Sequence, residues 1–296
     1  MTTKTETTAT PTKTITRLNW STLKHLAVSA KLLKWRVEHP EAETPSMVLG
    51  SAIHCAILEP EEFPKRWIVA TQCVGTVKST GAQCGSQGSI FAGDKWYCRV
   101  KGHAPDGAGP VPDGVHVIAL DQLEIVKACA AGIAEHKAAS RILKGGLAEH
   151  AIEWTDPELA IACRGRLDYL KTNQVIDLKS TIEETVRGFE RAVAQRLYYG
   201  QLAWYHDGAI AAGRLQSDAK LPALVSVQTC EPYDVAVYRL SKTAYEAGQI
   251  LYRDLLRKYR DCAAADFWPG IAPAERELEL PMWAPGMNGS DYGGEW

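Results

Sequence analysis

The sequence predicts a mixed α/β fold in which a small central sheet is flanked by helices. Apolar residues at helical spacing open the chain, in two segments at about 19–38 and 45–59. Three apolar runs that are typical of strands follow one another between residues 150 and 181. Beyond them, long helical segments alternate with a second pair of strand-like runs, and this alternation is typical of α/β domains.

The composition is that of an ordinary soluble protein. With 296 residues, of which 46% are hydrophobic and 23% charged, the chain can bury one large core, and global disorder is excluded. The net charge of −2 argues against a uniformly positive surface but leaves room for a local basic groove. We find no apolar run of about 18 residues, so no membrane span is expected. Five cysteines lie singly, as reduced thiols of a cytoplasmic protein do: Cys55, Cys129, Cys163, Cys230 and Cys262.

The first two helices are predicted from their end signals. Asn19 or Ser21 can cap a helix that runs to about Glu38. A second helix is expected to begin near Pro45 and to end at Pro60, because proline interrupts helical hydrogen bonding.

The segment that follows has a different character. From about residue 72 to 114 glycine is frequent and apolar periodicity is lost, so we expect no regular structure and interpret residues 71–115 as an insertion. Three cysteines and a histidine in it follow the spacing C-x10-C-x13-C-x4-H. A structural zinc ion would stabilise a segment that has no core of its own, although reduced thiols or an iron–sulfur cluster remain alternatives. The candidate zinc ligands are Cys73, Cys84, Cys98 and His103.

The remaining elements complete the α/β plan. A helix that starts near Asp121 is expected to stop at Gly145 and Gly146. The strand-like runs HAIEW, AIACRGRLDYL and NQVIDLKS come next, and the turn between the last two contains Thr172 and Asn173. The elements expected after them are a long helix, two strands and a final helix, at about 184–212, 223–230, 234–240 and 242–265.

Both ends of the chain are expected to lie outside the folded core. Residues 1–14 are rich in threonine and lack an apolar signal core, so we expect a disordered tail and no export signal. Residues 271–296 contain Pro273, Pro281 and Pro285 and are expected to be irregular.

The run VIDLKST carries the strongest chemical signal. Residues two apart on a strand share a face, so Asp177 and Lys179 project together while Leu178 turns into the core. Asp168 ends the preceding strand, and a hairpin would bring both aspartates to one point. Close carboxylates repel one another unless a cation lies between them, and such ligands suit Mg²⁺ or Mn²⁺. A metal would also lower the pKa of Lys179, which could then orient or deprotonate water, or stabilise charge on a phosphate.

Other residues could complete such a site. Gly50 and His54 lie one turn apart on the second helix, where the glycine permits close approach and the imidazole can bind a metal. Gln201 and Tyr205 lie one turn apart on the long helix and could hold a phosphate or the lysine. Glu149, at the start of the first central strand, could add a carboxylate. Taken singly, each feature has a structural alternative, such as a plain ion pair at a strand end.

Together these residues resemble the RecB-type branch of the PD-(D/E)xK nuclease superfamily, and more closely the RecE-like phage exonucleases of the exodeoxyribonuclease VIII family. The resemblance extends over stretches such as SMVLGSAIHCAILEPEEF, CRGRLDYL, VIDLKST and YYGQLAWYHDGA. It implies a PD-(D/E)xK, restriction-endonuclease-like core formed by residues 15–70 and 116–270. Its motifs GxxxH, E, GxxD, DxK and QxxxY fall at Gly50, His54, Glu149, Gly165, Asp168, Asp177, Lys179, Gln201 and Tyr205.

The resemblance also implies roles for these residues. Asp168 and Asp177 would bind a catalytic Mg²⁺ or Mn²⁺, assisted by His54 and the carbonyl oxygen of Leu178. Lys179 would activate water. Gln201 and Tyr205 would lie beside the phosphate, and Glu149 would add a further catalytic carboxylate.

The function implied is metal-assisted hydrolysis of linear duplex DNA from its free ends, 5′ to 3′, in phage-type recombination. The remaining 3′ strand would pass to a single-strand annealing protein, and members of the family can form rings around DNA. A phage or prophage origin would place the protein in the cytoplasm of a bacterial host. The alternatives are a structure-specific or restriction-like endonuclease and a catalytically silent DNA-binding protein of the same fold.

Overall fold

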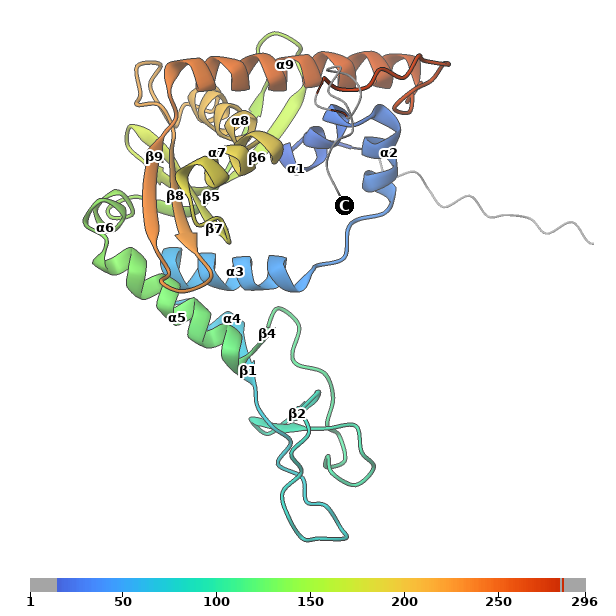
Figure 1. The fold of residues 1–296 in the computed structure, drawn as a ribbon, viewed down its shortest axis with the longest axis vertical. Helices are drawn as coiled ribbons and strands as arrows, with labels where there is room; N and C mark the ends of the chain where they lie inside the picture. The colour runs from blue at the N-terminus through green and yellow to red at the C-terminus, as the bar shows by residue number, and fades with distance from the viewer. Residues whose placement is uncertain (1–14, 283, 285–296) are drawn as a thin grey trace, which may run out of the picture.

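The computed structural model describes residues 15–282 and 284, so the predicted N-terminal tail and Pro285 lie outside the described residues. Its centre is a five-stranded sheet in the order β5-β6-β7-β8-β9, with β7 and β8 parallel and the other pairs antiparallel. Helices lie on both faces of this mixed sheet (Figure 1), which confirms the predicted fold class. The strands span Leu147–Thr155, Ala162–Lys171, Gln174–Thr181, Ala223–Gln228 and Val235–Arg239.

The strands form where the apolar runs predicted them. β6 and β7 are antiparallel around the turn at Thr172 and Asn173, with Lys171 opposite Gln174. Residues 174–178 of β7 are all buried, because helices cover both faces of this central strand. The parallel pairing of β7 with β8 requires a crossover between them, and two helices supply it.

Two helices cover one face of the sheet, α3 (Pro45–Leu58) and α5 (Leu120–Glu135). Thr44 caps α3 by accepting the N–H of Met47, so the helix begins where the sequence predicted. A buried cluster joins these helices to β7 and β8, and each such side chain stabilises the fold by about 1.5–3 kcal/mol. Its members include Ile53, Ile133, Ile176, Leu178 and Val225.

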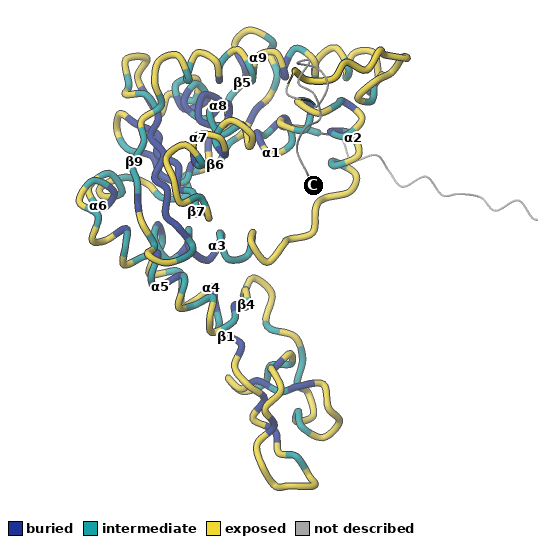
Figure 2. The backbone as a smooth tube through the Cα atoms, viewed as in Figure 1, coloured by how far each residue is buried: buried dark blue, intermediate teal, exposed yellow. Residues whose placement is uncertain are grey.

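The opposite face is covered by α8 (Tyr198–Ala211), and α9 (Lys242–Ala265) packs against α8 and the N-terminal helices. Trp20, Trp204 and Tyr252 belong to a second buried cluster there. Figure 2 shows the buried residues, in dark blue, gathered along the sheet strands. After α9, residues 267–282 contain neither helix nor strand. Among the described residues no helix has the length and apolar character needed to cross a membrane.

Three predicted helices are each divided in the structure. Ser29 starts a new helix inside the first segment, because its hydroxyl accepts the N–H of Leu32. His136 starts a new helix in the second segment by accepting a backbone N–H through Nδ1. In the third, Leu197 has a left-handed φ of +58° that ends the helical path. Apolar residues keep helical spacing across each break, and for this reason the sequence predicts single helices there. These three predictions were wrong. The first segment forms α1 (Trp20–Leu23), the 3₁₀ helix η1 (Lys24–Ala27) and α2 (Ala30–Glu38); the second forms α5 and α6 (Lys137–Ile142); and the third forms α7 (Val186–Gln195) and α8.

Residues 71–115, which we call the arm, project from the body of the protein (Figure 1). The short helix α4 (Phe63–Arg66) leads into β1 (Trp67–Ala70), and β1 pairs in parallel with β4 (His116–Ala119) at the base of the arm. The prediction of an arm without regular structure was wrong at its middle, where β2 (Ile90–Ala92) and β3 (Lys95–Tyr97) form a hairpin. Strands of three or four residues are too short to give a periodic signal in the sequence.

Candidate active site and metal centres

The β6–β7 hairpin forks at the two predicted aspartates. Its backbone pairing ends at Tyr169 and Ile176, the residues next to Asp168 and Asp177. From this point Oδ2 of Asp168 accepts the N–H of Leu178 at 2.9 Å. Leu178 directly follows Asp177, and besides burial the negative charge of Asp168 helps to raise the pKa of Asp177, so the two carboxyl groups lie near each other. The structure thus brings together the two carboxyl groups that the hairpin predicted would meet.

Asp177 and Lys179 project from the same face of β7. Nζ of Lys179 lies 2.5 Å from Oδ2 of Asp177 and 4.9 Å from the ring centroid of Tyr198, a cation–π contact that no motif indicated. Asp177 is 1% exposed. Neither of its carboxylate oxygens makes a hydrogen bond of good geometry with the described residues, so the Lys179 contact is an ion pair. Buried carboxylate oxygens without a hydrogen-bond donor are suited to bind a metal ion, or a water molecule that the metal ion holds.

Three side chains from three elements meet beside this pair. Ligand atoms of His54 on α3, Glu149 on β5 and Asp168 on β6 lie within 4.8 Å of one another. Nδ1 of His54 is 3.7 Å from Oδ2 of Asp168 and 4.0 Å from Oε1 of Glu149. Two carboxylates with one imidazole fit Mg²⁺ or Mn²⁺, so the donor set agrees with the predicted catalytic cation.

Glu149 reaches the site through an uncommon backbone conformation. Ala148 pairs with Tyr169 and His150 pairs with Leu167, so Glu149 stands opposite Asp168 but is skipped by the ladder. Its φ is +48°. This left-handed region costs a residue other than glycine roughly 1–2 kcal/mol, and such strain is concentrated at functional sites. The motif order had suggested Glu149 as an extra carboxylate, and the structure places it among the potential metal ligands.

Burial sets the ionisation of the acidic groups. It raises the pKa of Glu149 to about 7, and the negative charge of Asp168 adds to this effect. Burial also raises the pKa of Asp177 to about 6 and raises that of Asp168, although Lys179 opposes both shifts. Burial and then the charge of Lys179 lower the pKa of His54 to about 4, so the imidazole is neutral and free to ligate. A bound divalent cation would favour the ionised carboxylates that burial opposes.

Lys179 carries a positive charge in this setting. Burial lowers its pKa, but the carboxylates of Asp177 and Asp168 outweigh burial and raise the pKa above its ordinary value. The predicted lowering assumed a cation beside the ammonium, and with the protein groups alone the shift runs the other way. Lys179 therefore supplies a fixed positive charge, which suits orienting water or stabilising phosphate charge better than removing a proton.

The QxxxY pair lies on the side of α8 that faces the site. Nε2 of Gln201 donates to Oη of Tyr205 at 3.3 Å, and Gln201 lines the cleft described below. The Tyr205 ring packs on Gly165, where a Cβ would lie 3.0 Å from two ring carbons, so the ring position requires this glycine. Burial raises the pKa of Tyr205 to about 12, so the phenol keeps its proton. Gly50 is less constrained, because a Cβ there would meet Ser180 at 3.4 Å.

A cleft of about 620 Å³ contains the candidate site, and this volume is typical of ligand sites. The motif residues that line it are Gly50, His54, Glu149, Asp168, Lys179 and Gln201. Sequence reasoning missed Arg166, which lies 2.7 Å from Glu149 and whose side chain is 64% exposed. It also missed three residues near the base of the arm, which no motif marks: Arg66, Trp67 and His116.

A second ligand cluster lies within the arm. The thiols of Cys73, Cys84 and Cys98 are buried, and with His103 their ligand atoms lie within 4.8 Å of one another. The Sγ atoms of Cys84 and Cys98 are 3.8 Å apart, and Nδ1 of His103 is 3.2 Å from Sγ of Cys98 and 3.7 Å from that of Cys73. Tetrahedral zinc, with bonds of about 2.3 Å to sulfur and about 2.0 Å to nitrogen, separates neighbouring ligands by about 3.5–3.8 Å. The residues predicted from their spacing therefore fit one zinc ion.

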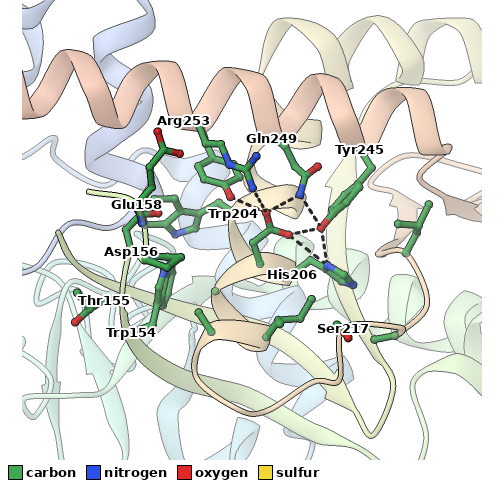
Figure 3. A pocket seen from close by; sticks show the side chains of 18 residues that line it. Trp154, Thr155, Asp156, Glu158, Trp204, His206, Ser217, Tyr245, Gln249 and Arg253 are labelled. Atoms are coloured by element: carbon green, nitrogen blue, oxygen red, sulfur yellow. Dashed lines mark hydrogen bonds and ion pairs between the residues drawn. The ribbon is translucent and has the colours of Figure 1, made fainter. Parts of the chain in front are cut away.

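Another cavity, of about 640 Å³, lies between α8, α9 and the β5–β6 turn (Figure 3). Asp207 in its wall accepts hydrogen bonds from Tyr252 at 2.6 Å, from Gln249 at 2.7 Å and from Tyr245. Arg253 lies 3.6 Å from the same carboxylate. Because these polar groups are engaged with one another, we interpret the cluster as a link between the two helices.

Asp207→Ala is expected to destabilise the protein by about 3 kcal/mol, because several donors between α8 and α9 would lose their acceptor. Denaturation in urea, followed by circular dichroism, measures this change. Asp254→Ala is the matched control, since Asp254 is exposed on α9 and pairs with Arg257 at 3.0 Å. It should change stability by less than about 1 kcal/mol. Equal losses in the two variants would contradict the role of Asp207.

Glu149→Gln is expected to raise the free energy of unfolding at pH 8, in a chelator, by roughly 2–3 kcal/mol. The folded pKa of about 7 lies above the ordinary 4.5, so the wild type loses stability as the pH rises from 4.5 through 7. Glutamine has no charge to bury. The difference between the proteins should therefore be small at pH 4.5 and full above pH 7, as measured by denaturant unfolding across this range. A difference that does not vary with pH would contradict this explanation.

Comparison with known proteins gives a family and a fold. The profile described as "PDDEXK-like domain of unknown function (DUF3799)" matches residues 20–275. A crystal structure described as that of a "putative exonuclease" from Eubacterium rectale has a TM-score of 0.55, covers 92% of this chain and 94% of its own, and is 9% identical, so the likeness is one of fold. The structure of SSO0001 is 18% identical over 46% of this chain and 64% of its own, with a TM-score of 0.25. No curated protein matches significantly.

Proposed function

The chain belongs to the family of PDDEXK-like domains of unknown function (DUF3799), and from this premise we propose that it is a metal-dependent nuclease that hydrolyses linear duplex DNA from its ends. One observation carries the proposal: Asp168, Asp177 and Lys179 converge at the fork of β6 and β7. The ligand atoms of His54 and Glu149 lie beside them. Two carboxylates that can bind a divalent cation, next to the ammonium group of Lys179, suit the hydrolysis of a phosphodiester bond.

The protein would bind its catalytic cation, Mg²⁺ or Mn²⁺, at this fork. When bound, the cation polarises a phosphoryl oxygen and lowers the pKa of a water molecule. The buried carboxylate oxygens of Asp177 and the neutral imidazole of His54 suit this role. The residues that would hold the cation are Asp168, Asp177, His54, Glu149 and, through its carbonyl oxygen, Leu178.

Three other side chains would act on water and phosphate. The ammonium of Lys179 would orient the attacking water and stabilise negative charge on the phosphate. Gln201 donates to Oη of Tyr205, which leaves the protonated phenol free to donate onward to a phosphate oxygen. Both groups would thus hold the phosphate in line with the attacking water.

The biological setting follows from the resemblance to RecE-like exonucleases. It suggests digestion 5′ to 3′, in phage-type recombination, with a single-strand annealing protein as partner and a ring-shaped homo-oligomer around the DNA. It also suggests the cytoplasm of a bacterial host, with a phage or prophage origin. The fold shared with a protein described as a "putative exonuclease" supports attack from ends.

A time course with Mg²⁺ on end-labelled linear duplex and on closed circular duplex tests the proposal. We expect nucleotide release from the linear DNA, intact circles, and loss of a 5′ label before a 3′ label. A chelator and Asp177→Asn should each stop the reaction. Cleavage of circles would instead favour the restriction-like alternative. Absence of any hydrolysis with Mg²⁺ or Mn²⁺ would contradict the nuclease proposal and favour DNA binding alone.

We further propose that the arm holds a structural zinc ion on Cys73, Cys84, Cys98 and His103. The ligand separations support a single tetrahedral ion. Three thiols and one imidazole differ from the four thiolates that most iron–sulfur clusters use. Metal analysis of the purified protein should find one zinc ion per chain, and its absence would leave the cysteines as reduced thiols.

A further inference from the structure

Both ends of the arm reach the wall of the candidate catalytic cleft. β1 leads into the arm and β4 leads out of it, and the two strands pair with Trp67 opposite His116. Both side chains line the cleft that also contains Glu149 and Asp168. The base of the arm is therefore part of the wall of the cleft that also contains these candidate metal ligands.

An aromatic stack supports this part of the wall. The ring centroids of Phe63 and Trp67 are 6.2 Å apart with planes inclined by 13°, and those of Trp67 and His116 are 4.7 Å apart with planes inclined by 26°. Trp67 is 6% exposed, whereas His116 at the outer end of the stack is exposed. The imidazole ring of His116 is thus supported on one side by Trp67 and exposed to solvent in the cleft.

Two arginines line the same cleft as this ring. Arg66 precedes Trp67 and is held by Glu59 through hydrogen bonds of 2.8 and 3.3 Å. Arg166 reaches the same cleft from β6. Guanidinium groups bind phosphate oxygens, and aromatic rings stack on nucleobases of any sequence. A ring for the base and guanidinium groups for the backbone together suit a nucleotide strand.

We propose that His116, supported by Trp67, is the ring on which a nucleobase next to the scissile phosphate stacks. This inference rests on the proposed nuclease function and names how the cleft would hold its substrate. His116 binds the base and takes no part in the chemistry. The arm then has a function in substrate binding, because its base carries the stacking ring into the cleft.

Steady-state kinetics of His116→Ala and His116→Phe on a short end-labelled duplex test the inference. For His116→Ala we expect KM to rise about ten-fold and kcat to change by less than about two-fold, since stacking contributes to binding alone. Phenylalanine should restore KM, because it keeps the flat ring. Bis(p-nitrophenyl) phosphate has no base, so all variants should hydrolyse it at the wild-type rate.

His39→Ala is the matched control, because His39 stacks on Trp35 with centroids 4.8 Å apart but does not line the cleft. It should leave KM unchanged. If the wild type hydrolyses neither substrate, the nuclease proposal fails by itself, and His116 is then tested by the affinity for fluorescent oligothymidine in EDTA. His116→Ala should weaken that affinity about ten-fold, and His116→Phe should restore it. Unchanged binding in His116→Ala, or a loss that phenylalanine does not restore, overturns the inference.

Discussion

Lys179→Ala is expected to lower the rate of phosphodiester hydrolysis by about 10³-fold, equivalent to about 4 kcal/mol of transition-state stabilisation. The ammonium lies 2.5 Å from Asp177, and its side chain is 15% exposed, so little water can replace the lost charge. The variant would keep the metal-binding carboxylates while losing the group that holds water and phosphate. Initial rates of nucleotide release from end-labelled linear duplex with Mg²⁺ measure the effect.

Lys171→Ala separates loss of this charge from damage to the hairpin. Lys171 lies at the turn end of the same hairpin, where its Nζ donates to the carbonyl oxygen of Arg141. Its replacement should leave the rate within about two-fold of the wild type, and circular dichroism should show both variants folded. A Lys179→Ala protein that is folded and fully active would contradict the assignment of Lys179.

The centre of the site could be predicted from the sequence because it depends on strand geometry. The two-residue period of a strand puts Asp177 and Lys179 on one face, and a short hairpin brings Asp168 back to them. The order of the motifs added His54, from a helix far away in the sequence. The apolar pattern predicts the strands and the helix that carry these four residues, and their positions on those elements bring them to one site.

The rest of the cleft depends on features that sequence patterns do not carry. The left-handed φ of Glu149 has no residue signature, because glutamate rarely adopts it. Trp67 and His116 meet only because two four-residue strands, separated by the whole arm, pair in parallel. One weak indication pointed to Arg166: it lies two residues before Asp168 on the same strand and so shares its face. An arginine at such a position is equally typical of a solvent-exposed face.

The divided helices show the same limit. Ser29 and His136 act as caps, yet serine and histidine also occur within helices, and apolar spacing continues on both sides of each break. The break at Leu197 places Gln201 and Tyr205 on a helix of their own. The motif thus depends on a backbone turn that helical periodicity alone would not predict.

Cys98→Ser is expected to remove zinc from the arm and to unfold it, because serine oxygen is a poor zinc ligand and binding contributes about 10 kcal/mol or more in small zinc sites. Cys98 lies 3.8 Å from Cys84 and 3.2 Å from His103, at the centre of the cluster. The buried hydrophobic side chains of the arm are those of the three cysteines and Trp96. Hydrophobic burial therefore contributes little to the stability of the arm. Metal analysis should show the zinc lost, and trypsin should cut at Lys78, Arg99 and Lys101.

The unfolding should be confined to the arm, since β1 and β4 join it to the body through four paired residues each. We therefore expect the melting temperature of the body to change little, while hydrolysis of bis(p-nitrophenyl) phosphate continues. Cys262→Ser, outside the arm, should keep both zinc and protease resistance. His103→Cys offers a second check, because four thiolates still bind zinc tetrahedrally and should keep the arm folded. If Cys98→Ser retained zinc, or if the metal-free arm resisted trypsin as the wild type does, the cysteine cluster would not be what orders this segment.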